Sequence, residues 1–463
     1  MTISTPTMEY RYESESCLEP VEGGAELRFA TFGGTVPEVS GGLQQVAAPY
    51  FFSGFLEHPD VVAAALLVVA RVSRTRFYTP PNVTAAVLRA ADPVVTSTAE
   101  GLRFEAFSVC CGVHVRLDVL ADGLDAQYTA TGVTNVDVNP PLREALAGLR
   151  AREPLHMRVG SDELAVTTLD GSVSEARVPL PVRWCRGFAE AQFLSAGMVL
   201  RHEMDVAAAR RFVQGLPRSS SVRTVLWATP GVGVVRLAST PGPGTVCLAG
   251  PERLRVIEPL LPFATGLYGF AGEADRSSLP MASGWVLGLP GARLTVTLSP
   301  EKARGFSGEG AVLVGLAGDC VEDDADLVSA MLAFEPRIDI DHLSRETALP
   351  AQRVADALGV LACSGQVGYD LAGASYFHRP LPLSGAALAV MNPRLGNAEA
   401  LLAANAVEHQ LDGYLVHSGG AEYRVVLGEP DRCTCPWWVK YRGTRGPCKH
   451  VLAVRLSGKD AVS

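Results

Sequence analysis

Three cysteines and one histidine near the C-terminus are the residues of this chain whose types and spacing specify chemistry most narrowly. Cys433 and Cys435 form a Cys-x-Cys pair, and Cys448 and His450 form a Cys-x-His pair after a gap of twelve residues. Thiolate and imidazole are preferred ligands of Zn²⁺, and four of them complete the tetrahedral shell of a structural site, which leaves no position for a catalytic water. The spacing therefore predicts a structural zinc site.

The twelve residues between the two pairs have the composition of a surface loop, with two prolines, two glycines, three aromatic residues and three basic residues. If the four candidate ligands were instead small buried core residues, the basic residues Arg432, Lys440 and Lys449 would lie in a core segment, which makes that alternative less favoured. The residues that we expect to contact nucleic acid or a protein partner are Lys440, Arg442, Arg445, Lys449, Trp437, Trp438 and Tyr441.

The segments on either side of the ligands predict how they are held. A hairpin is expected before Cys433, with arms at 414–417 and 423–427 around Gly419 and Gly420, and an apolar run at 451–454 follows His450. The arrangement resembles the SWIM-type zinc finger, in which a hairpin bears the first ligand pair and a helix starts near the second. The resemblance covers residues 412–457 and implies a small ββα-type finger with Zn²⁺ as its cofactor. A helix at 398–410 is expected to lead into it.

Length and composition indicate a globular protein. The chain has 463 residues, of which 48% are hydrophobic and 19% charged, enough to bury a large core in two or three domains. Its longest apolar stretch, 61–70, is much shorter than the roughly 20 residues that cross a bilayer. The acidic N-terminus has no basic and apolar signal pattern. We therefore expect a cytoplasmic protein without membrane contact, whose ten cysteines stay reduced or bind metal.

Charge is distributed unevenly along the chain. Residues 431–463 contain seven basic and two acidic residues, a net charge of +5, whereas the whole chain carries −9, so residues 1–430 carry −14. A basic finger on an acidic body is the asymmetry expected of a local contact with a polyanion. A solvated basic face without a ligand remains the alternative.

Residues 1–320 predict an α+β region of unknown role, made of one or two domains. Its strand candidates are rich in β-branched or aromatic residues, and its helix candidates combine small and apolar residues with an Asp or Asn near the start. The predicted strands are 26–31, 102–107, 113–119, 224–228 and 293–298, and the predicted helices are 59–73, 141–151 and 206–214.

Residues 321–382 resemble a winged helix-turn-helix domain. Helical patterns at 325–334, 342–347 and 350–363 precede a predicted hairpin with arms at 367–371 and 375–378. The segment 350–363 takes the place of the recognition helix, but Gln352, Arg353 and Asp356 offer one base and one acid, so the domain could bind either DNA or protein. A linker at 380–385 separates it from the C-terminal unit, 384–463.

No other cluster is assigned a function. Cys110, Cys111 and His114 are expected to pack, because adjacent strand residues point to opposite faces. His202 and Glu203 lack the second histidine of a zincin helix, since position 206 is Val. The chain contains no phosphate-binding loop, dinucleotide fingerprint or nucleophile elbow. We therefore expect a non-enzymatic protein.

Several segments outside the finger extend the resemblance to bacterial SWIM zinc-finger proteins: 51–80, 103–119, 131–141 and 369–378. Such proteins are often encoded beside a MoxR-type AAA+ ATPase and a von Willebrand A-domain protein, which implies a multi-protein assembly. The leading hypothesis is that the finger, with or without the winged helix, contacts DNA or RNA. The alternative is a protein-protein adaptor within an assembly that includes the AAA+ ATPase.

Overall fold

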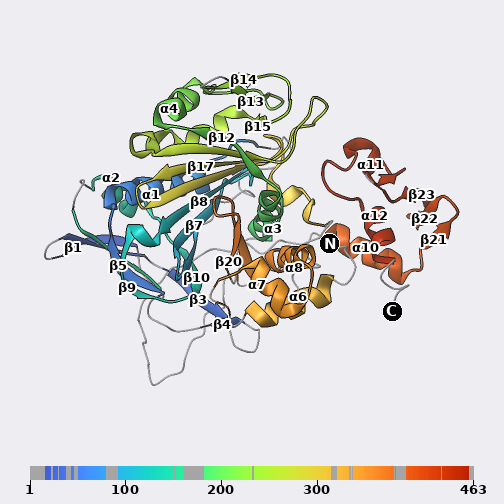
Figure 1. Ribbon diagram of the computed structural model, residues 1–463, viewed down its shortest axis with the longest axis horizontal. Coiled ribbons are helices and arrows are strands. Elements are labelled where there is room, and N and C mark those ends of the chain that lie inside the picture. Colours follow the sequence, from blue (N-terminus) through green and yellow to red (C-terminus); the bar gives the residue numbers. More distant parts are fainter. Residues whose placement is uncertain are drawn as a thin grey trace, which may run out of the picture.

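The computed structural model (Figure 1) describes residues 16–21, 24–29, 31–37, 43–45, 51–79, 92–149, 153–160, 182–231, 234–313, 321–332, 335, 337–379, 381, 393–428 and 430–457. They form a mixed α and β structure, as the sequence predicts. None of the helices found in these residues is both long and apolar enough to cross a membrane.

The described residues between 16 and 313 are called the body below. An antiparallel sheet of ten strands forms its centre. In sheet order its strands are β12 (Val199–Met204), β16 (Gly266–Ala271), β17 (Ser283–Leu289), β18 (Ala292–Leu298), β8 (Val113–Leu120), β7 (Gly101–Phe107), β6 (Val94–Thr98), β10 (Gly132–Val136), β3 (Thr31–Pro37) and β4 (Leu43–Gln45). Strand β7 is buried on both faces. Its alternate residues Leu102 and Phe104 join the main hydrophobic core, while Arg103 and Glu105 lie on the opposite face.

Two smaller sheets and their helices flank the central sheet. The five-stranded sheet consists of β1 (Cys17–Val21), β2 (Gly24–Arg28), β11 (Leu155–Val159), β5 (Phe52–Leu56) and β9 (Leu124–Thr129). The three-stranded sheet consists of β14 (Val234–Ala238), β13 (Val225–Gly231) and β15 (Val246–Ala249). The remaining helical elements of the body are α1 (Pro59–Arg74), η2 (Ala121–Gly123), α2 (Pro140–Ala147), α3 (Val182–Ala196), α4 (Val206–Gly215), η3 (Pro251–Phe263) and η4 (Phe306–Gly308).

Helix α1 shows why these residues are helical. Pro59 occupies the first turn, where no backbone donor is needed, and Asp60 and Arg71 complement the helix dipole at the two ends. The helix packs against β7 and β8 and is buried along most of its length, which explains its nearly continuous apolar sequence. Sequence patterns predict α1 and α4 to within one residue.

Other predictions for the body need correction. The expected strand 26–31 is wrong, because β2 ends at Arg28 and a separate strand, β3, begins at Thr31. Helix α2 ends at Ala147, because the chain turns at Gly148. Helix α3 and the 3₁₀ helix η3, which contains Pro259 and Pro262, were not predicted.

Residues 321–379 contain three helices and a two-stranded hairpin in the predicted order: α6 (Val321–Leu332), α7 (Ile340–Thr347), α8 (Ala351–Cys363), β19 (Val367–Asp370) and β20 (Ser375–His378). Helix α6 begins four residues before the predicted start at 325. The helices share a hydrophobic cluster of their own. Helix α8 also contacts α3, and Arg353 binds both carboxylate oxygens of Asp324 on α6, at 2.7 and 2.6 Å. The guanidinium of Arg353 is thus engaged within this segment. The expected linker at 380–385 lies, apart from Leu381, outside the described residues.

A buried network of ion pairs joins this hairpin to the central sheet. Arg116 donates to the backbone oxygen of Tyr369 at 2.6 Å and to Asp370 at 2.7 Å. Arg379, directly after β20, donates to both carboxylate oxygens of Glu105, at 2.8 and 2.9 Å. The hairpin therefore packs on the polar face of β7 and β8.

The C-terminal unit lies at one end of the molecule (Figure 1). It contains α10 (Pro393–Ala403), a four-stranded sheet of β21 (Val407–Gln410), β22 (Gly413–Ser418), β23 (Ala421–Val426) and β24 (Arg432–Cys433), and helices α11 (Pro436–Tyr441) and α12 (Lys449–Ser457). The predicted hairpin is confirmed: Gly419 and Gly420 both have positive φ, as a tight two-residue turn requires.

The helix expected at 398–410 is wrong in its extent. Asn405 adopts a left-handed conformation with φ of 50°, and Ala406 donates its N–H to the carbonyl oxygen of Leu401 at 3.0 Å. These features close the C-terminus of α10. The residues after it form β21, so the finger sheet begins before residue 412.

Candidate metal centre

The four predicted ligands are supplied by three adjacent elements of the finger. Cys433 ends β24, and Cys435 caps α11 by accepting a hydrogen bond from the N–H of Trp438 at 3.4 Å. Cys448 precedes α12 and accepts from the N–H of Val451 at 3.5 Å, and His450 lies in the first turn of α12. Both thiols at helix starts thus receive backbone donors, which favour the thiolate that a metal requires.

The geometry fits a tetrahedral metal site. One ligand atom from each of the four residues lies within 4.8 Å of all the others. The Sγ of Cys433 is 3.8 Å from the Nδ1 of His450. A zinc ion with Zn–S bonds of about 2.3 Å would place two sulfurs about 3.8 Å apart, so these spacings need little adjustment. All four residues are buried, with at most 6% of their surface exposed.

The thiols are too close together to titrate independently. Hydrogen bonding with Cys435, and then with Cys448, raises the pKa of Cys433. The same contact with Cys433 lowers the pKa of Cys435. The Cys433 and Cys435 pair is stable with one thiol protonated and the other ionised. Three neighbouring thiolates repel one another and require a cation between them. The chemistry of the donor set therefore fits a divalent metal ion.

His450 is positioned by an aromatic neighbour from the finger sheet. The Tyr423 ring on β23 stacks on the imidazole with ring centroids 4.3 Å apart and planes inclined at 24°. Since Nδ1 faces the Cys433 thiol, the proton belongs on Nε2, which is buried and has no hydrogen-bond partner among the described residues. Sequence reasoning did not identify Tyr423, which lies outside the ligand motif.

The predicted contact residues divide into two groups. Lys440 and Arg442 are exposed at the end of α11, and Lys449 is half-buried. Arg445 instead turns toward the body: it donates to the backbone oxygen of Gly308 and lies 3.7 Å from the Glu309 carboxylate. The structure thus leaves Lys440 and Arg442 facing solvent and holds Arg445 in an internal interface.

The predicted aromatic residues are all partly buried and contribute to packing. Trp437 and Trp438 pack against the hydrophobic cluster that contains the ligands. The rings of Trp437 and Tyr441 lie 4.5 Å apart, and the Arg445 guanidinium lies 5.0 Å from the centre of the Tyr441 ring. Although the ligand gap was predicted as a loop, its first half forms the short helix α11, which buries no residue completely.

The finger docks against the body through Arg394 on α10, a residue that sequence reasoning missed. Its guanidinium donates to the backbone oxygens of Arg445 at 2.7 Å, Pro447 at 3.1 Å and Glu309 at 2.6 Å. A close approach of Gly446 to the Gly310 carbonyl adds to the interface, since a Cβ at Gly446 would lie 1.9 Å from that oxygen. Arg394 contacts backbone oxygens of loop residues, and Gly446 and Gly310 also lie in loops, so nothing in the sequence pattern marks these contacts.

The alternative metal cluster is not supported. Among the described residues, the finger provides the one group of three or more potential ligands close enough to share an ion. Cys110 and Cys111 lie in the turn between β7 and β8, although the prediction placed them in a strand. His114 faces Glu105 at 3.4 Å, and burial is the main cause that lowers its pKa. These residues pack in the body, as the sequence analysis expects.

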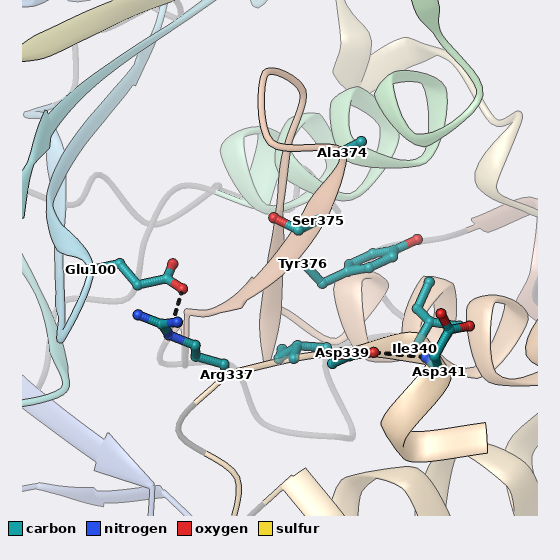
Figure 2. A pocket seen from close by; sticks show the side chains of 9 residues that line it. Glu100, Arg337, Asp339, Ile340, Asp341, Ala374, Ser375 and Tyr376 are labelled. Atoms are coloured by element: carbon teal, nitrogen blue, oxygen red, sulfur yellow. Dashed lines mark hydrogen bonds and ion pairs between the residues drawn. The ribbon is translucent and has the colours of Figure 1, made fainter. Parts of the chain in front are cut away.

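A pocket of about 510 Å³ lies between the β6–β7 turn and the three-helix segment. Figure 2 shows the ion pair of Glu100 and Arg337 at one end, Asp339 and Asp341 at the other, and Ser375 on β20 between them. The Asp339 carboxylate already caps α7 by accepting from two backbone N–H groups. Among the described residues, no hydrogen bond joins the Ser375 hydroxyl to a carboxylate of this lining, so no reaction is assigned to the pocket.

Comparison with known proteins identifies the finger. Residues 423–457 match the family model of the SWIM zinc finger, so the candidate metal centre belongs to a SWIM zinc finger. No curated protein matches the chain.

Two solved structures show slight similarity. Proliferating cellular nuclear antigen from Entamoeba histolytica is 10% identical, covering 54% of this chain and 98% of its own, with a TM-score of 0.33. A PCNA2–PCNA3 complex from Sulfolobus tokodaii is 7% identical, covering 54% of this chain and 100% of its own, with a TM-score of 0.32. Likeness at these scores bears neither on the fold nor on the function of this chain.

Proposed function

Because residues 423–457 form a SWIM zinc finger, we propose that the chain is a non-enzymatic Zn²⁺ protein whose finger contacts nucleic acid. The observation that carries the proposal is the placement of Lys440 and Arg442, which are exposed at the end of α11, next to the partly exposed ring of Tyr441. Cations interleaved with aromatic rings are typical of surfaces that bind phosphates and stack bases.

The structural role of the metal supports the non-enzymatic part of the proposal. Three thiolates and one imidazole fill a tetrahedral shell, and all four residues are buried. Zinc would supply folding energy to the finger, by tying β24 to the starts of α11 and α12. Substrate access to the ion would require loss of a ligand.

The contacts within the molecule limit the number of phosphates that the finger can neutralise. Arg445 lies against Glu309, and Arg455 binds Asp431 at 2.8 Å, so their charges are balanced internally. Lys440, Arg442 and Lys449 remain as candidate phosphate contacts. Three contacts predict that the logarithm of the affinity falls with the logarithm of the salt concentration at a slope of roughly −2 to −3.

Titration of labelled single- and double-stranded DNA and RNA at several salt concentrations tests the proposal. The variant Lys440→Ala, Arg442→Ala should weaken binding and reduce the steepness of the salt dependence by roughly 1.5 to 2. Arg424→Ala is the matched control, because Arg424 is an exposed finger arginine that pairs with Asp412. If the intact protein binds none of the four nucleic acids at low salt, or if both variants bind alike, the proposal fails.

A protein adaptor is the second candidate, and one feature of the finger favours it. Val439 on α11 is 66% exposed, and Val426 at the end of β23 and Leu427 directly after it are also exposed. Apolar residues in such positions are common at protein interfaces. By the resemblance noted above, the partner would be a MoxR-type AAA+ ATPase. A pull-down from native lysate in which nuclease leaves the captured proteins unchanged, and Val439→Lys loses them, would support the adaptor.

A further inference from the structure

A small pocket lies beside the metal centre. It has a volume of about 290 Å³, and its walls include Arg394, Tyr423, Pro436, Trp437, Lys449 and His450, in addition to two of the thiol ligands. Small-molecule sites in proteins begin at roughly this size. The pocket is therefore large enough for one planar ring system and too small for a folded element of a partner.

The walls combine aromatic rings with positive charge. Tyr423 and Trp437 offer ring surfaces, and the Arg394 guanidinium lies 4.8 Å from the centre of a Trp437 ring. The lining residues include no carboxylate. A divalent ion with three thiolates has a net charge of −1, and Arg394 and Lys449 bring the local total to +1. A pocket so nearly neutral suits an uncharged aromatic group better than a phosphate or a cation.

Two donors in the lining lack an acceptor. The indole Nε1 of Trp437 and the Nε2 of His450 are buried and have no hydrogen-bond partner within the described residues. A buried donor without a partner is unfavourable, and an acceptor that reached it would relieve that cost. The ring nitrogens and carbonyl oxygens of nucleobases are acceptors of this kind.

We propose that this pocket binds one unstacked nucleobase of a single-stranded nucleic acid, an inference that rests on the nucleic-acid function proposed above. Pro436 and Trp437 begin α11, and Lys440 and Arg442 lie at its other end. A strand whose base enters the pocket can therefore follow α11 and place its phosphates along these cations. A duplex keeps its bases stacked and paired, so the finger prefers single strands.

An abasic oligonucleotide provides the direct test, because it keeps the phosphates and removes the bases. Binding of the zinc-loaded full-length protein to labelled oligothymidylate is compared with binding to an abasic strand of the same length at the same salt concentration. One stacked base predicts that the abasic strand binds roughly 5- to 150-fold more weakly. Trp437→Leu should remove most of this difference while the salt dependence stays unchanged.

Each result distinguishes the inference from the function on which it rests. If the two strands bind equally tightly, the base pocket is refuted, and the phosphate contacts of Lys440 and Arg442 still stand. If neither strand binds at low salt, both proposals are refuted. Zinc content is measured for Trp437→Leu, and the comparison of strands with the unaltered protein holds even if that variant loses the metal.

Discussion

Replacing Arg379 with methionine should weaken the docking of the β19–β20 hairpin on the central sheet. Arg379 is completely buried and donates to both carboxylate oxygens of Glu105, which is 1% exposed. Although burial alone would raise the pKa of Glu105, Arg379 and then His114 lower it, so the carboxylate is charged in the folded protein. Methionine fills the apolar space and leaves that charge buried with a weakened set of partners.

The expected loss is about 3–5 kcal/mol, the usual result of removing one partner of a buried pair. His114 lies 3.4 Å from Glu105 and can recover part of the loss by gaining a proton. Arg337→Ala is the control, because Arg337 also bridges the three-helix segment to the sheet, through Glu100 at 3.4 Å, but is 75% exposed. That exposed pair should contribute less than about 1 kcal/mol.

Hydrogen exchange of the hairpin amides measures the loss of stability at the hairpin itself. A local measurement is preferable because a chain with several hydrophobic clusters need not unfold in one step. Exchange in β19 and β20 should accelerate by a factor of roughly 100 to several thousand in Arg379→Met. A double variant that also carries Glu105→Leu should recover most of the protection, since no charge is then left unpaired. The reasoning is refuted if Arg379→Met and Arg337→Ala accelerate exchange equally.

Two further predictions concern segment 304–313 of the body, which contacts the finger. Gly446→Ala should separate the finger from the body, because the added Cβ would meet the Gly310 carbonyl oxygen. Gly419→Ala is the control and should cost only the roughly 1–2 kcal/mol of a left-handed backbone. Segment 304–313 should lose protection from hydrogen exchange in Gly446→Ala and keep it in Gly419→Ala. Glu190 accepts from the N–H groups of Ala311 and Val312, and burial raises its pKa from 4.5 to about 7. The Glu190 carboxyl therefore ionises at a lower pH in the unfolded chain than in the folded protein. Between pH 4.5 and 7, the free energy of unfolding of the wild type should fall by about 3 kcal/mol relative to that of Glu190→Gln. The same change in denaturation midpoint for both proteins over this pH range would contradict this.

The features that sequence predicts well depend on residues close together in the chain. The four metal ligands fall within eighteen positions, and Gly419 and Gly420 specify the hairpin turn between two alternating strands. Pro59 and the long apolar pattern after it predict helix α1. Such signals act within one element and are readable before any tertiary contact is known.

The features that sequence does not predict are set by contacts between distant residues. Glu105 and Arg379 are 274 positions apart, and each alone resembles an ordinary surface charge. The charge of Arg445 predicts a nucleic-acid contact, but Glu309 and Gly308 in the body set the direction of its side chain. The base pocket depends on Arg394 and Tyr423, which lie outside the ligand motif. Charge and aromatic content identify a candidate surface, while packing decides which of its residues face solvent.

Metal analysis of the purified full-length protein tests the central claim most directly. The account predicts one Zn²⁺ per chain, and its loss from the variant Cys433→Ser, Cys448→Ser. Cys17→Ser, a partly buried cysteine of β1 remote in sequence from the finger, should keep the metal. Full zinc content in the double variant, or zinc absent from a natively purified wild-type chain, would contradict the assignment of the centre to these four residues.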